Sequence, residues 1–191
     1  MTLEADITAF LRTNPFINNL NFSFGSFRVY PSAYRHDVAS CIDSGQIKVR
    51  AKGGSSAAAG ASYDMAFDSL ELSPSFSIGS PDCQAFLIHE CTHAHLDIQR
   101  IGAHSGHANE AVAYLAEAVF LQAAGQPPLG LQKIRVVAHS IAKTVLAGNY
   151  SVAPTDVAML TAEVATHPHY MTSVSYVSNG FDRGIMQRIL R

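Results

Sequence analysis

The sequence predicts an α+β fold in which a small N-terminal sheet, with its edge strand packed on a long helix, precedes a helical C-terminal half. Two patterns carry this prediction. Apolar residues alternate with a period of two in the first 75 residues, and they recur with helical spacing after residue 80. The chain has 191 residues, of which 48% are hydrophobic and 15% charged, so it can bury a core without disulfide bridges. No linker or internal repeat divides it, and we expect a single domain over residues 1–191.

The expected elements of the N-terminal half are one helix followed by strands. In chain order they are a helix at 3–12, a strand across 22–29, a short strand at 46–51, a loop of small residues at 52–62 and a strand at 62–73. In the last of these, SYDMAFDSLELS, the alternation of apolar residues slips by one position after Phe67. Such a slip predicts a bulge or a bend in the strand.

The C-terminal half is expected to form helices over 81–102, 107–122, 131–148 and 153–165. Their ends follow from capping residues. Ser80 is a suitable N-cap, Pro81 suits the first helical position, and Gly102 is the natural stop of the first helix. Pro168 ends the last one, because proline cannot donate the next backbone hydrogen bond.

Composition excludes several classes of protein. A formal charge of −2 gives no electrostatic basis for binding nucleic acid or an anionic membrane, and no apolar run approaches the roughly 20 residues that span a bilayer. Three cysteines (Cys41, Cys83 and Cys91) are too few for a disulfide framework. The N-terminus lacks a basic region followed by an apolar run, so we expect a cytoplasmic protein, or one exported without a classical signal peptide.

The segment HECTHAH, at 89–95, carries the candidate chemistry. At about 100° per residue, His93 lies about 40° round the helix from His89 and one turn along it, so both imidazoles can bind one metal ion. Glu90 flanks them and is placed to reach a water on that metal, as a general base must. Cys91 and His95 point away from the metal side, and we interpret them as packing residues.

The third ligand should come from an element packed against this helix. The next helix supplies Glu110 and Glu117, which lie on one stripe because they are seven residues apart. HExxH followed by a helix that starts NEAVAY, at 109–114, resembles the gluzincins, the zincin metallopeptidases that include thermolysin. The resemblance covers residues of about 60–120. It implies a Zn²⁺ ion held by His89, His93 and Glu110, with Glu90 as base, while Glu117 remains the competing third ligand.

The chain departs from these families at two positions. Where thermolysin-like enzymes place an Asp that supports a histidine, this chain has Tyr114. Where metzincins need a third His it has Gln99, which excludes that group. The resemblance also implies a substrate-aligning edge strand, for which 62–72 is the candidate, and a donor to the oxyanion. HPHYM supplies Tyr170 as the first candidate donor and His169 as the second.

The predicted function is zinc-dependent hydrolysis of peptide bonds in a peptide or protein substrate. A chain of this size has little room to wall its cleft, so we also expect a partner protein that confers specificity or inhibits. Two alternatives stay open. One is a deformylase-like zinc hydrolase, with Cys41 as third ligand although ASCIDSG does not match that motif. The other is a protein that holds a structural zinc, or no metal, without catalysis. A cytidine deaminase is excluded because no PCxxC follows.

Overall fold

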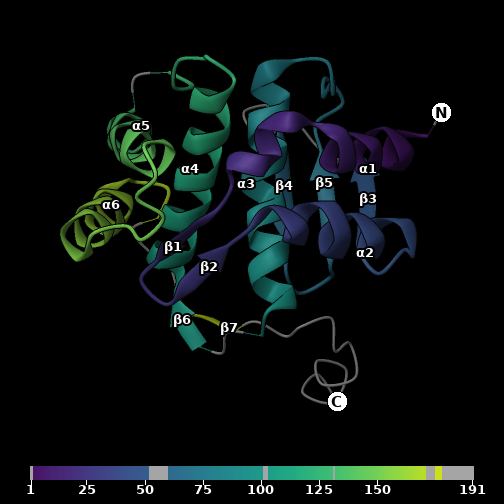
Figure 1. The fold of residues 1–191 in the computed structure, drawn as a ribbon. Coiled ribbons are helices and arrows are strands. Elements are labelled where there is room, and N and C mark those ends of the chain that lie inside the picture. The colour runs from purple at the N-terminus through teal and green to yellow at the C-terminus, as the bar shows by residue number, and fades with distance from the viewer. Residues whose placement is uncertain (1, 52–59, 101–102, 131, 171–174, 178–191) are drawn as a thin grey trace, which may run out of the picture.

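The computed structural model describes residues 2–51, 60–100, 103–130, 132–170 and 175–177. It confirms the α+β prediction: short helices and small sheets make up the N-terminal half, and long helices dominate the rest (Figure 1). None of the described helices is both long and apolar enough to cross a lipid bilayer.

Residues 2–43 fold as a helix, a hairpin and a second helical stretch. In order these are α1 (Leu3–Thr13), the 3-10 turn η1 (Pro15–Asn19), β1 (Phe22–Phe24), β2 (Phe27–Val29), the π-helical η2 (Ala33–Val38) and α2 (Ala39–Asp43). The helix expected at 3–12 is confirmed as α1. The strand expected across 22–29 is instead an antiparallel hairpin, in which Phe24 lies opposite Phe27. Gly25 makes the turn at φ +59°, a left-handed conformation that costs a residue without a Cβ little.

A three-stranded sheet follows, made of β3 (Lys48–Ala51), β4 (Ala61–Asp64) and β5 (Ser69–Leu72), in the order β3-β5-β4. The strand expected at 46–51 is confirmed as β3, whereas most of the loop expected at 52–62 lies outside the described residues. The single bent strand expected at 62–73 is wrong, because β4 and β5 are two antiparallel strands joined by a turn. Within the described sheet, β4 is an edge strand.

Helix α3 (Pro81–Ile98) carries the HExxH segment and packs against β4, as expected of the edge strand. On another side it meets η2, where the hydroxyls of Tyr34 and Thr92 are 2.7 Å apart in the core. Ser80 occupies the N-cap position, but its side chain makes no capping hydrogen bond, contrary to the prediction. The stop expected at Gly102 lies outside the described residues.

The helical half consists of α4 (Gly106–Ala123), α5 (Lys133–Leu146) and α6 (Pro154–Thr166), which confirms the three helices expected there. Helix α4 is central: it contacts α3 on one side and α5 and α6 on the other (Figure 1). A short antiparallel pair, β6 (Ala103–Ser105) and β7 (Ser175–Val177), was not among the predicted elements. It brings residues 175–177 to the start of α4.

Gly60, the residue before β4, packs closely against the side chain of Phe86 on α3. A Cβ added at Gly60 would lie 2.7 Å from Cδ2 of Phe86, closer than side chains tolerate. We therefore expect Gly60→Ala to lower the free energy of unfolding by about 1–3 kcal/mol, the usual cost of overpacking. Gly79→Ala is the control, because the nearest atom would be 3.8 Å away. Denaturant unfolding of both variants tests this, and equal transition midpoints would contradict it.

Candidate metal centre

Helix α3 places two buried imidazoles on one side of itself. His89 is 6% exposed and His93 is 7% exposed, and their ring centroids are 5.0 Å apart, as residues one helical turn apart should be. Cys91 and His95 are buried elsewhere on the helix, as predicted. The Nε2 atom of His95 lies 2.9 Å from the carbonyl oxygen of Arg28.

Helix α4 adds a carboxylate that faces both imidazoles. Oε2 of Glu110 is 3.4 Å from Nε2 of His89, and Oε1 is 3.6 Å from Nε2 of His93. The ligand atoms of the three residues all lie within 4.8 Å of one another. These are the three residues that were predicted from sequence as metal ligands, and the packing of α3 on α4 brings them together into a possible metal site.

The spacing suits a small divalent metal ion. Bonds from zinc to nitrogen or oxygen are about 2.0–2.2 Å long, so two ligands of a tetrahedral ion lie about 3.3–3.6 Å apart. The distances from Glu110 to the two Nε2 atoms agree with that separation. Two imidazoles and a carboxylate also leave a fourth position for water or substrate, the pattern typical of catalytic rather than structural sites. The residues therefore fit a metal ion in both chemistry and geometry.

His93 is oriented by its other ring nitrogen. Nδ1 of His93 is hydrogen-bonded to Oδ1 of Asn109, and Nδ2 of Asn109 lies 2.7 Å from Nε2 of His104. An amide oxygen can only accept, so Nδ1 carries the proton and Nε2 is left free for a metal. In the sequence, Asn109 stands out only as part of the NE dipeptide, and no pattern indicates a role for His104.

His89 is oriented by Glu117, the residue that the sequence left as a competing ligand. Oε2 of Glu117 is 3.4 Å from Nδ1 of His89, on the side of the ring that faces away from Glu110. This contact is longer than a good hydrogen bond, but both atoms are buried and make no other hydrogen bond in the described structure. Oε1 of Glu117 accepts a 2.8 Å hydrogen bond from Nε of Arg135, on α5. In this arrangement Glu117 lies outside the group with metal-site spacing and faces the other nitrogen of His89, as a residue that supports a ligand would.

Replacing Glu117 with glutamine should weaken metal binding by about 10–100-fold without abolishing it, the usual effect of losing a group that orients a ligand. Competition with a chromophoric zinc chelator measures this. Glu163→Gln is the matched control, since Glu163 on α6 pairs with Lys133 on α5 at the surface, as Glu117 on α4 pairs with Arg135 on α5. Thermal unfolding of the variant is measured as well, because the substitution removes the negative charge that pairs with Arg135. An unchanged affinity in folded Glu117→Gln protein would contradict the supporting role.

The charges of the centre favour a cation at its middle. Burial alone raises the pKa of Glu110, but His93 and His89 hold it well below its usual range. Burial alone lowers the pKa of His89, but the carboxylates of Glu110 and Glu117 raise it well above its ordinary value. The pKa of His93 is raised by Glu110 in the same way, against the effect of burial. The carboxylates that attract protons to these rings also attract a divalent cation.

Glu90 lies beside the ligands and is held by the edge strand. Its Oε2 accepts a 2.7 Å hydrogen bond from the backbone N–H of Tyr63, on β4. Burial raises the pKa of Glu90 above its ordinary value, although His89 and His93 oppose this effect. A carboxylate with a raised pKa is a stronger base, as proton abstraction requires.

Tyr170 reaches the centre from the segment after α6, whereas His169 does not. The hydroxyl of Tyr170 is 3.0 Å from that of Tyr114, and it lies close enough to Glu110 for the carboxylate to raise its pKa, as burial does more strongly. Its carbonyl oxygen accepts from Nε2 of His107 at 2.9 Å, which anchors the segment to α4. His169 is exposed and touches only the edge of the Tyr170 ring among the aromatic contacts described. Of the two donors proposed from sequence, Tyr170 is the one whose hydroxyl lies near Glu110, and its role as a donor to the oxyanion stays a prediction.

Tyr114 and Arg135 lie next to the candidate ligands, and neither contact was predicted from sequence. The ring of Tyr114 meets that of His89 edge-on at 4.7 Å, and the guanidinium carbon of Arg135 lies 5.4 Å from the Tyr114 ring centroid. Cys41, the ligand in the deformylase-like alternative, is a free cysteine on α2. In the described part of the chain, the group with metal-site spacing contains His89, His93 and Glu110 but no cysteine.

Comparisons with models of protein families, with curated proteins and with solved structures found no match to this chain. The assignment of a candidate metal centre therefore depends on the geometry of these residues. That geometry has three parts: two imidazoles and a carboxylate at ligand spacing, a contact that orients each imidazole, and the carboxylate of Glu90 next to them, outside the ligand group.

Proposed function

We propose that the chain is a zinc-dependent metallopeptidase of gluzincin-like design, with His89, His93 and Glu110 as ligands and Glu90 as general base. The observation that carries the proposal is the convergence of Glu110 on both Nε2 atoms, 3.4 and 3.6 Å away, with Glu90 adjacent but outside the ligand group. A structural zinc site uses four protein ligands and has no need of a neighbouring base.

When bound, zinc would polarise the scissile carbonyl and lower the pKa of a water molecule. Glu90 accepts that water's proton and later passes it to the leaving amine. The Tyr170 hydroxyl donates a hydrogen bond to the oxygen of the carbonyl as negative charge develops there. These steps use residues that surround Glu110 in the fold.

The edge strand β4 supports a peptide as the substrate. It is the outer strand of its sheet in the described structure, it packs on α3, and the backbone N–H of Tyr63 lies within hydrogen-bonding distance of Glu90. An extended peptide can add to such an edge through backbone hydrogen bonds. The strand would thus align the scissile bond with the base. A partner protein that covers this edge would inhibit or restrict the activity.

The test is hydrolysis of a mixed peptide library by chain that has been stripped of metal and reloaded with zinc. Cleavage that depends on zinc and stops on chelation would support the proposal, and mass spectrometry identifies the bonds cut. If the zinc-loaded chain cleaves neither the library peptides nor protein substrates such as casein, the peptidase proposal is wrong. Stoichiometric zinc in that inactive protein would then favour the non-catalytic alternative.

A further inference from the structure

A further histidine lies behind the residue that orients His93. The amide oxygen of Asn109 is hydrogen-bonded to Nδ1 of His93, and its amide nitrogen is 2.7 Å from Nε2 of His104, on β6. The side chain of Asn109 is fully buried, so water does not satisfy either end of the amide. The amide of Asn109 therefore lies between two imidazoles, one at its oxygen and one at its nitrogen.

The two ends of the amide determine where the protons of both rings lie. An amide oxygen can only accept, so Nδ1 of His93 carries a proton and Nε2 keeps its lone pair, 3.6 Å from Oε1 of Glu110. An amide nitrogen can only donate, so Nε2 of His104 is the acceptor and its proton is on the other ring nitrogen. A metal ion that binds Nε2 of His93 requires this orientation of the amide.

The reversed orientation of the amide is the competing arrangement. A half-turn of the Asn109 amide would bring its nitrogen to His93 and its oxygen to His104. His93 would then accept at Nδ1, carry its proton on Nε2 and donate it toward Glu110. That proton would lie between two of the three candidate ligands, in the place of the metal ion.

An acceptor at residue 104 favours the metal-bound state over the metal-free one. In the metal-bound state the amide nitrogen of Asn109 must point away from His93, so it needs an acceptor on its other side. Nε2 of His104 is in that place. If the acceptor were lost, the metal-free chain could reverse the amide and pair its nitrogen with His93, whereas the metal-bound chain would keep a buried donor without a partner.

Two other elements hold His104 in position. Its ring meets the ring of Phe27, on β2, edge-on, with 5.3 Å between the centroids. Phe27 is itself buried in the core. The backbone of His104 lies opposite Tyr176 in the antiparallel pair of β6 and β7. The hairpin and the strand β7 thus contact the centre through His104, although none of the three candidate ligands belongs to them.

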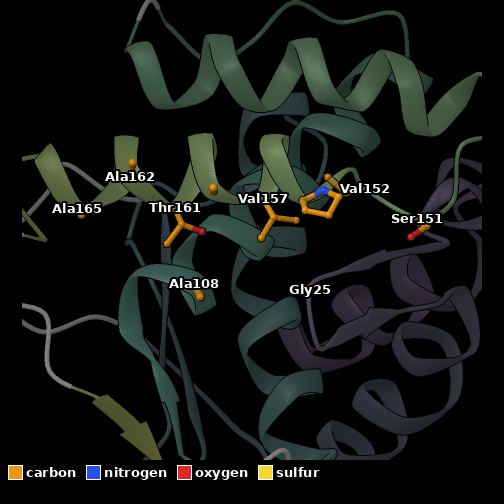
Figure 2. A pocket seen from close by; sticks show the side chains of 10 residues that line it. Gly25, Ala108, Ser151, Val152, Val157, Thr161, Ala162 and Ala165 are labelled. Atoms are coloured by element: carbon orange, nitrogen blue, oxygen red, sulfur yellow. The ribbon is translucent and has the colours of Figure 1, made fainter.

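A groove of about 720 Å³ runs along α6, beside the first turn of α4 (Figure 2). Its lining includes Ala108, the residue before Asn109, together with small side chains of α6 such as Ala158 and Ala162. Neither Asn109 nor His104 belongs to the described lining, and nor do the candidate ligands. Nothing in the structure indicates what covers this groove, and we assign no ligand to it.

We propose that His104 is a positioning residue of the metal centre, which acts through the amide of Asn109 to keep the proton of His93 on Nδ1 and its Nε2 free for a metal ion. This inference rests on the metal centre of the proposed function and adds a residue that no sequence pattern indicates. It does not depend on the reaction, because any ion bound through Nε2 of His93 requires the same amide orientation.

The experiment measures zinc affinity by chelator competition. His104→Phe keeps a ring against Phe27 but offers no acceptor, and it should weaken zinc binding about 10-fold or more. His104→Gln can place an amide oxygen near the position of Nε2, and its affinity should stay within about threefold of wild type. His36→Phe, the same substitution at an exposed histidine on η2, is the control and should leave the affinity unchanged. Thermal unfolding of each variant shows whether it is folded.

Asn109→Asp tests whether His104 acts through Asn109. Both oxygens of a carboxylate accept, so a reversed side chain would still accept from Nδ1 of His93. In the Asn109→Asp background, His104→Phe should therefore change zinc affinity by less than about threefold. A loss of about 10-fold in both backgrounds would mean that His104 acts by another route, and the proposal would be wrong.

The position of the His93 proton gives a second readout. In metal-free protein, at a pH at which the ring is neutral, ¹⁵N NMR of the imidazole shows which nitrogen carries the proton. Wild type should have a larger share of the Nδ1–H form than His104→Phe. Equal shares would overturn the proposal, and so would an unchanged zinc affinity in folded His104→Phe or an equal loss of affinity in His104→Gln.

These outcomes separate the role of His104 from the proposed function. The affinity is measured without a peptide, so a chain that binds zinc but cleaves nothing would overturn the peptidase proposal and leave the role of His104 intact. A wild-type chain that binds no zinc would overturn the metal centre. The position of the His93 proton would then still decide whether His104 orients the amide of Asn109.

Discussion

Replacing Glu110 with glutamine should reduce zinc binding by more than about 100-fold, beyond the 10–100-fold typical of residues that merely support a ligand. Wild type should retain one zinc per chain after dialysis. The variant loses the ligand that faces both imidazoles and the negative charge that offsets the ion. Metal content of untagged protein, measured by mass spectrometry, gives the stoichiometry. Chelator competition gives the affinity, and the rise in melting temperature on adding zinc gives an independent value.

Glu117→Ala is the control for this experiment, because Glu117 faces the opposite nitrogen of His89. It should weaken zinc binding without removing it. If Glu117→Ala loses zinc and Glu110→Gln retains it, then Glu117 is the third ligand and Glu110 is the supporting residue. Wild-type chain that takes up no stoichiometric zinc, even when zinc is added back, would overturn the metal centre and the peptidase proposal together.

The two candidate ligands on α3, His89 and His93, are predictable from sequence because helix geometry alone determines how they lie relative to each other. Residues four apart lie one turn apart on the same face, whatever the rest of the fold does. The same calculation placed Cys91 and His95 away from the metal side, where both are buried. Helix geometry alone could not predict Glu110 as a ligand, because a contact between two helices depends on how they pack. Its assignment came from the resemblance of its NE dipeptide to a known family pattern.

Support for the imidazoles was harder to predict. Glu117 was recognised as relevant because it lies on the stripe of Glu110, but its role depends on which nitrogen of His89 it faces. Arg135 is 18 residues further on, in another helix, and its guanidinium reaches Glu117 only through the packing of α5 on α4. No local pattern in KIRVVAH distinguishes it from an ordinary surface arginine.

The turn between β4 and β5 shows a limit of periodicity. A one-residue slip in alternation fits a bulge and a tight turn equally well, and 62–73 contains no glycine or proline to mark a turn. The signal was Asp64, whose carboxylate accepts hydrogen bonds from the N–H groups of Ala66 and Phe67. Aspartate makes such turns without glycine, and Asp68 then adopts a left-handed φ of 47°.

Replacing Glu90 with glutamine should lower kcat/KM for zinc-dependent peptide hydrolysis by about 10²–10⁴-fold, the contribution typical of a general base, while zinc stays bound. A glutamine has nearly the shape of a glutamate, and its amide oxygen can still accept from the backbone N–H of Tyr63. The substitution therefore removes basicity and leaves the position of the side chain intact. Steady-state kinetics and metal content are measured on the same preparation.

Glu71→Gln, on β5 of the same sheet, is the control for a changed carboxylate that lies outside the centre. It should keep both zinc and activity. Loss of zinc in Glu90→Gln would mean that Glu90 holds the ion or its surroundings, and activity near that of wild type would mean that another group takes the proton. Retained zinc with lost hydrolysis is the combination expected of a base, because Glu90 lies beside the three ligand residues but is not one of them.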